Sequence, residues 1–163
     1  MGVQAWSPGS EGSVRISRCA SSTARPQVER NMINGSCCCG AIKFELINPP
    51  SMMGTCHCSR CRKVGASTLV FVKKDDFRWI QGQEFVARYE PEAPYKHSRT
   101  FCKQCGTSLG EAGSQQDSFP ISANCLDADP LVRNTFHVFV ASKPAWYEIC
   151  DSAKQFQEYP PNG

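Results

Sequence analysis

The sequence lacks several features that mark common protein classes. No apolar run approaches the roughly 18 residues that a membrane-spanning helix needs, so we expect no membrane association. The first residues also contain no continuous apolar segment of the kind found in a secretory signal peptide. The number of cysteines is odd, which is unusual for an extracellular disulfide scaffold. We therefore expect a cytoplasmic protein with reduced thiols.

A strong basic excess is missing as well. The formal net charge is only +3, and residues 1–31, with four arginines against two glutamates, account for most of it. The body from Met32 onward is close to neutral. An extended nucleic-acid surface normally shows a large basic excess. We therefore expect no nucleic-acid partner.

The third absence is sustained helical periodicity, because no apolar stripe of about 3.6-residue period continues over a dozen residues. Short segments instead alternate apolar and polar residues between turns rich in Gly, Pro and Asp. This pattern predicts a mainly β fold of short antiparallel strands with little helix. The expected strands are 41–47, 68–72, 77–80, 85–89, 95–101, 119–123 and 136–140.

Three connecting segments carry further expectations. Residues 81–83, Gln-Gly-Gln, predict a hairpin that joins the strands on either side of them. Residues 60–63 predict a single helical turn. The aromatic residues in 143–161 predict that this tail packs back on the body.

Residues 1–31 differ from the rest of the chain. They are rich in Ser, Gly, Pro and Arg without apolar periodicity, which predicts a disordered leader outside the fold. Two alternatives stay open. Residues 1–31 could be an organelle transit peptide of similar composition, or Met32 could be the true first residue of the protein, with the preceding residues assigned to it in error. We expect one β domain over residues 32–163.

Eleven cysteines dominate the composition. Seven of them fall into three groups, which are Cys37-x-Cys39, Cys56-x-Cys58-x-x-Cys61 and Cys102-x-x-Cys105. Zinc in proteins usually takes four tetrahedral ligands, so the economical division is four plus three. We expect the first and last groups, the four-thiol cluster, to hold a structural zinc ion. We expect the middle group, the three-thiol cluster, to hold a catalytic one with a fourth position open to water or substrate.

Local geometry favours metal over disulfides. In an extended C-x-C the middle residue points away from its neighbours, which turns Cys38 and His57 away from the clusters. Residues three apart in a helical turn share a face, so the last two thiols of the middle group can converge. Gly40 and Gly106 fit tight turns of positive φ whose N–H groups can donate to sulfur. Disulfides remain the alternative, although adjacent cysteines at 37–39 are too close for ordinary pairing.

The remaining candidate residues have open interpretations. Cys125 and Cys150 lie among apolar residues, which predicts small core side chains, and Cys38 is either oxidisable or inert. His137 opens a core strand and is more typical of a hydrogen-bonded core histidine than of a base. Four polar residues surround the three-thiol cluster in the sequence: His57, Arg60, Arg62 and Lys63. They form either a polar collar that would suit an anionic tripeptide or a set of solvated charges.

The cysteine groups lie within stretches that resemble a known family. These stretches are GSCCCGAIKFEL, CHCSRCRK, FCKQCGTSL and HVFVASKPAWYEI with a QF-x-EYP tail, over residues 34–161. They resemble the glutathione-dependent formaldehyde-activating enzymes, which are grouped with the centromere protein V domain. The resemblance implies an Mss4-like β fold with zinc knuckles, and the same division into structural and catalytic zinc. It also implies the joining of glutathione to formaldehyde, formally a carbon–sulfur lyase reaction run backwards.

We therefore expect a zinc-dependent carbon–sulfur lyase-type enzyme that uses two zinc ions and a small thiol such as glutathione. Three thiolates weaken zinc as a Lewis acid, which favours thiolate chemistry over hydrolysis. The alternative is a zinc-stabilised, chaperone-like binding module, in which the three-thiol cluster gains a fourth protein ligand. Chromatin or microtubule binding, as in centromere protein V, would need a more basic tail.

Overall fold

The computed structural model describes residues 32–161, so the predictions for residues 1–31 lie outside the described part of the chain. Within this part, short strands are the main regular structure, and α1 (Ser59–Lys63) is the α-helix predicted as a single turn. The strands are β1 (Ile33–Ser36), β2 (Lys43–Leu46), β3 (Met52–Cys56), β4 (Thr68–Lys73), β5 (Phe77–Gln81), β6 (Val86–Tyr89), β7 (Arg99–Cys102), β8 (Ser108–Gly110), β9 (Ser118–Ser122), β10 (Asn134–Val138) and β11 (Lys154–Gln155). The 3-10 turns are η1 (Lys74–Asp76), η2 (Gln83–Phe85), η3 (Ala123–Cys125) and η4 (Val140–Ser142). The expected mainly β fold with little helix is confirmed.

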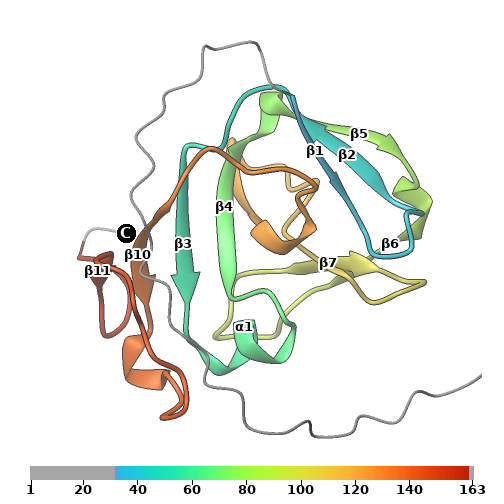
Figure 1. Ribbon diagram of the computed structural model, residues 1–163. Coiled ribbons are helices and arrows are strands. Elements are labelled where there is room, and N and C mark those ends of the chain that lie inside the picture. Colours follow the sequence, from blue (N-terminus) through green and yellow to red (C-terminus); the bar gives the residue numbers. More distant parts are fainter. Residues whose placement is uncertain (1–31, 162–163) are drawn as a thin grey trace, which may run out of the picture.

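The strands form three sheets (Figure 1). Their orders are β1-β2-β5, β11-β10-β3-β4-β9 and β6-β7-β8. Neighbouring strands are antiparallel, except that β10 runs parallel to both β3 and β11. The chain leaves β3 directly into α1, which lies beyond the ends of β3 and β4 in Figure 1. None of the helices in residues 32–161 has the length and apolar character needed to cross a membrane.

The largest apolar core receives side chains from all three sheets. Phe44 of β2, Val70 of β4 and Leu109 of β8 are each at most 1% exposed within it. The alternation predicted for β2 is only partly right, because Glu45 is buried as well. Its carboxylate accepts a hydrogen bond of 2.7 Å from Nε of Arg78 on the neighbouring β5. A cross-strand ion pair thus allows an acidic residue at a position that the pattern places in solvent.

The predicted hairpin at residues 81–83 is wrong. β5 pairs with β2 and β6 pairs with β7, so the two strands belong to different sheets. Gly82, with φ of 76°, precedes η2 and redirects the chain between them. The turn itself was predictable from its residues, but the strand pairing was not, because both partners lie far away in the sequence.

The tail of the described chain packs on the body, as predicted. β11 extends the five-stranded sheet, and the N–H of Phe156 donates to the carbonyl oxygen of His137 at 2.8 Å. Tyr159 packs edge-on against Phe139, with 4.7 Å between ring centroids. The packing is partial, because Trp146 and Tyr159 remain 77% and 59% exposed.

Gly82 provides a test of how rigid this arrangement is. A Cβ at Gly82 would lie 1.9 Å from the carbonyl oxygen of Ala41, whereas Gly65, with a similar φ of 68°, has nothing within 4 Å. We expect Gly65→Ala to lower the free energy of unfolding by about 1–2 kcal/mol, the cost of the left-handed backbone. Gly82→Ala should cost roughly 1–3 kcal/mol more because of the clash. Urea denaturation measures both, and equal losses would contradict a tight Ala41 contact.

Candidate metal centres

The first and last cysteine groups meet in space, as predicted. Cys37 follows β1 and Cys102 ends β7, and both are buried, while Cys39 and Cys105 are exposed. All four Sγ atoms lie within 4.8 Å of one another, with 3.5 Å between Cys37 and Cys39. Four thiols at this spacing fit a tetrahedral zinc ion. Since β1 and β7 belong to different sheets, an ion bound here would connect those sheets.

Two similar turns bring these thiols together. Gly40 and Gly106 have φ of 72° and 75°, and each N–H donates at 2.8 Å to the carbonyl oxygen of the first cysteine of its group, Cys37 or Cys102. The predicted positive φ is confirmed, but these N–H groups bond to oxygen rather than to sulfur. The donor to sulfur is the N–H of Ile42, which lies 3.2 Å from Cys37 Sγ. The two pairs therefore present their thiols from near-equivalent backbone turns.

The three-thiol cluster forms where β3 runs into α1. Cys56 is the last residue of β3, and Cys58 caps α1 by accepting a hydrogen bond of 3.5 Å from the Cys61 N–H. Their three Sγ atoms lie within 4.8 Å of one another, and no other Cys, His, Asp or Glu of residues 32–161 joins the group at that distance. This donor set fits a zinc ion with three protein ligands and one open position.

Hydrogen bonding among the three thiols separates their acidities. Hydrogen bonds from Cys56 and Cys61 lower the pKa of Cys58 to about 2. The pKa of Cys56 is raised, chiefly by its hydrogen bond with Cys58, then by its hydrogen bond with Cys61 and by burial. Cys58 is therefore the thiol of this cluster that ionises first.

Arg99 of β7 contacts the three-thiol cluster. Its Nη2 donates to Cys61 Sγ at 3.5 Å, and its Nη1 lies 3.7 Å from the carboxylate of Glu111. The Glu111 side chain is only 4% exposed, and it also forms a hydrogen bond of 2.9 Å with Nδ1 of His97. Sequence reasoning missed Arg99, because it lies 38 residues from Cys61 and belongs to no local motif. A buried carboxylate thus holds a cation beside the thiols.

The predicted polar collar is only partly formed. Arg60 lies over the ring of Tyr95, 4.2 Å from its centroid. Arg62 and Lys63 are exposed, as the alternative of solvated charges predicts. His57 is buried and is not a solvated group. The cation in contact with the thiols is therefore Arg99, which was not among the four residues expected.

Thiols and imidazoles lie on opposite faces of the five-stranded sheet. In the β3–β10 register, Cys56 pairs with Val138 and Thr55 pairs with His137. Because neighbouring residues of a strand point to opposite faces, His57 shares the face of Thr55 and His137. Cys56 and Val138 pack together in a separate small core on the other face. The prediction that His57 turns away from the thiols is confirmed.

A chain of hydrogen bonds runs across the imidazole face. Nε2 of His57 lies 2.8 Å from Nδ1 of His137, and Nε2 of His137 lies 2.9 Å from Oδ1 of Asp151. Burial lowers the pKa of His57, and hydrogen bonds from Asn134 and His137 lower the pKa of Asp151 to about 2. His57 is therefore neutral and Asp151 ionised at neutral pH. The prediction that His137 is a hydrogen-bonded core histidine is confirmed.

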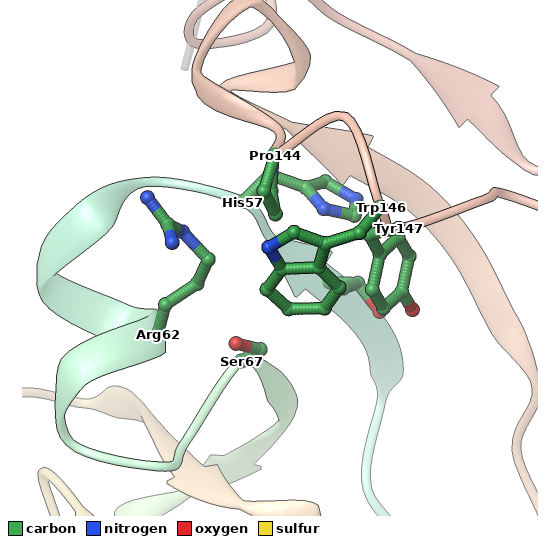
Figure 2. Close-up of a pocket in the computed structure, with 7 residues that line it drawn as sticks. His57, Arg62, Ser67, Pro144, Trp146 and Tyr147 are labelled. Carbon is green, nitrogen blue, oxygen red and sulfur yellow. The ribbon is translucent and has the colours of Figure 1, made fainter.

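A cavity of about 300 Å³ opens on this imidazole face. Figure 2 shows Arg62 of α1 on one side of it, and Trp146 and Tyr147 from the loop that follows η4 on the other. The complete lining is Thr55, His57, Arg62, Ser67, Pro144, Trp146 and Tyr147. No motif in the sequence pointed to this cavity, because its walls come from segments about 80 residues apart.

Within residues 32–161, the cysteines outside the two clusters divide into buried and exposed ones. Cys125 is 2% exposed, which confirms it as a core residue. Cys150 is exposed, so its predicted burial is wrong. The cause is that its apolar neighbourhood in the sequence includes Trp146, which itself faces solvent. Cys38 is exposed as well, while its N–H donates to Oγ1 of Thr107 at 3.0 Å.

Comparison with known proteins identifies the family. Residues 32–142, which contain both cysteine clusters, match the family model of the glutathione-dependent formaldehyde-activating enzymes. The chain belongs to this family. One curated relative is a Halomonas elongata protein, which is provisionally named a glutathione-dependent formaldehyde-activating enzyme. It is 31% identical to this chain over 142 residues. That match covers 79% of this chain and 89% of the relative.

Two further matches are more distant. An uncharacterized lyase of Schizosaccharomyces pombe is 25% identical over 123 residues, covering 75% of this chain and 88% of the relative. The crystal structure of a Rhodobacter sphaeroides protein aligns with 26% identity and a TM-score of 0.48, covering 59% of this chain and 89% of that one.

Proposed function

We propose that this family member is a zinc-dependent enzyme of the carbon–sulfur lyase type. Its substrate would be the adduct of glutathione, or of a similar small thiol, with formaldehyde or another small electrophile. The observation that supports this is the three-thiol cluster, which has no fourth protein ligand among residues 32–161. The alternative, a zinc-stabilised binding module, requires that fourth ligand.

In this proposal the three-thiol cluster holds the catalytic zinc ion and the four-thiol cluster holds the structural one. When bound, zinc supplies a Lewis acid that lowers the pKa of a coordinated thiol. In the direction of addition, the thiol sulfur forms a bond to the aldehyde carbon and the carbonyl π bond opens. The proton lost by the thiol ends on the former carbonyl oxygen, so the reaction needs no further reactant.

The chain's own contribution is to attract and orient the thiol. Arg99, whose side chain is 14% exposed, lies beside Cys61, and Arg60 extends from α1 on the ring of Tyr95. The Arg99 guanidinium beside the cluster suits a carboxylate of an anionic tripeptide, to which it can form charge-assisted hydrogen bonds. Glu111 limits the freedom of Arg99 and thereby fixes its position.

A turnover assay tests this proposal. The zinc-loaded protein is mixed with glutathione and formaldehyde, and then with other small aldehydes, and each rate is corrected for the spontaneous reaction. We expect saturable acceleration with at least one aldehyde. A protein that binds zinc at both clusters and accelerates none of these reactions would favour the binding module instead.

Arg99→Gln should raise the KM for glutathione by about tenfold or more, because a hydrogen bond to a charged group contributes roughly 1.5–3 kcal/mol. Arg99→Lys should recover part of the loss, and a neutral thiol such as 2-mercaptoethanol should be little affected. The matched control is Arg88→Gln, which removes an exposed arginine on the adjacent β6. Equal losses for charged and neutral thiols would show that Arg99 has only a structural role.

A further inference from the structure

We propose that the cavity on the imidazole face is a second small-molecule site, which binds a planar carboxylate that carries an N–H or O–H donor. The site lies across the sheet from the three-thiol cluster. It goes beyond the function proposed above and does not depend on it.

The ionised carboxylate of Asp151 lets us assign the protons on both imidazoles. The carboxylate of Asp151 only accepts hydrogen bonds, so Nε2 of His137 carries a proton and donates it at 2.9 Å. Nδ1 of His137 must then accept, and Nε2 of His57 is its donor at 2.8 Å. Nδ2 of Asn134 donates to the second carboxylate oxygen at 3.1 Å and also lies 2.9 Å from Nε2 of His137. Because the ionised carboxylate is a stronger acceptor than any group of a neutral amide, we assign the Nε2 proton to the bond with Asp151. His57 is therefore left with a lone pair on Nδ1.

That lone pair has no partner in residues 32–161. His57 is 3% exposed, and none of the hydrogen bonds of the described chain involves its Nδ1. Every fully buried side-chain nitrogen or oxygen of the described residues has a hydrogen-bond partner. Since Nδ1 of His57 has none, it must retain some solvent-accessible surface. It therefore opens to the cavity that His57 lines. Buried acceptors are normally satisfied, so this position selects a ligand with a donor group.

The other walls supply charge and an aromatic face. Arg62 has no ion-pair partner among the described residues, which leaves its guanidinium available for a carboxylate. Trp146 is 77% exposed and lines the same cavity, where its indole offers a stacking surface to a flat ligand. Tyr147 packs edge-on against His57, with 5.2 Å between ring centroids. Figure 2 shows Arg62 and the aromatic pair on different segments of the chain.

The size of the cavity limits the ligand. About 300 Å³ is at the lower end of the range of small-molecule sites, which suits a molecule with one ring better than a tripeptide. The guanidinium of Arg62, the indole of Trp146 and the acceptor nitrogen of His57 together match an aromatic acid with a hydroxyl or amino substituent. The geometry does not match a neutral aliphatic molecule, which would leave both Arg62 and Nδ1 of His57 without partners.

Isothermal titration calorimetry on the zinc-loaded full chain tests the proposal, with 3-hydroxybenzoate and 4-hydroxybenzoate as probes. We expect saturable binding of at least one probe with one site per chain, and weaker binding of benzoate, which lacks the donor. Arg62→Gln and Trp146→Ala should each weaken binding at least tenfold without changing the zinc content. Lys63→Gln is the matched control, since Lys63 is an exposed cation of the same helix outside the cavity lining.

Three results would overturn the proposal. One is the absence of saturable binding for both probes at millimolar concentration. Another is binding that neither the Arg62 nor the Trp146 substitution weakens, which would place the probe elsewhere. The third is displacement of the probe by glutathione, which would make the cavity part of the thiol site rather than a second site.

Discussion

Removal of zinc from the four-thiol cluster should unfold the protein. Cys37 follows β1 of one sheet and Cys102 ends β7 of another, and both thiols are fully or almost fully buried. Structural zinc contributes about 10 kcal/mol of apparent binding free energy in small domains, which is comparable to the whole stability of a domain of roughly 5–15 kcal/mol. Treatment with a strong chelator should therefore abolish the cooperative thermal transition seen by circular dichroism.

A pair of cysteine variants separates metal loss from simple thiol loss. Cys102 and Cys125 are 0% and 2% exposed, but only Cys102 belongs to a cluster. Cys102→Ser should yield an unfolded or zinc-depleted protein. Cys125→Ser should remain folded and lose only the roughly 1–3 kcal/mol typical of a substitution in a buried site. A chelated sample that kept the native melting curve would show that this cluster does not stabilise the fold.

Cys58→Ser should abolish turnover and leave the protein folded. The three-thiol cluster packs in a small core of its own with Val138, apart from the core to which all three sheets contribute. Loss of one half-buried ligand should therefore remove the zinc of this cluster without disturbing the larger core. Circular dichroism and the glutathione–formaldehyde assay measure the two effects separately.

The matched control for Cys58→Ser is Cys150→Ser, which removes an exposed thiol outside both clusters. It should change neither turnover nor melting temperature. Unfolding of Cys58→Ser would instead make the three-thiol cluster structural. Full turnover by the folded variant would place the chemistry elsewhere in the molecule.

Both cysteine clusters could be predicted from the sequence, because the spacing within each cysteine group is local information and the number of thiols matches zinc ligation. The spacing Cys56-x-Cys58-x-x-Cys61 follows from a strand end that enters a helical turn, and the structure has β3 and α1 at these positions. The grouping of residues 37–39 with residues 102–105 followed from counting zinc ligands rather than from any knowledge of sheet pairing. The alternation at Phe44 likewise identified a core strand.

The features that the sequence did not reveal depend on contacts between distant segments. β3 was missed because Met52–Cys56 lacks clear alternation and contains Gly54. The structure explains that glycine, because a Cβ there would lie 2.2 Å from the ring of Phe136 on β10. The parallel pairing of β3 with β10 also brings His57 to His137, 80 residues away. Arg99 reaches Cys61 in the same way, through sheet packing that no motif records.

The most direct test of the open three-thiol zinc site is the number of zinc ions bound per chain, measured by elemental analysis of purified wild type and Cys58→Ser. We predict two ions in the wild type, and one in a variant that still gives the wild-type circular dichroism spectrum. A wild type with a single ion, or a folded variant that keeps both, would contradict the site on which the proposed function rests.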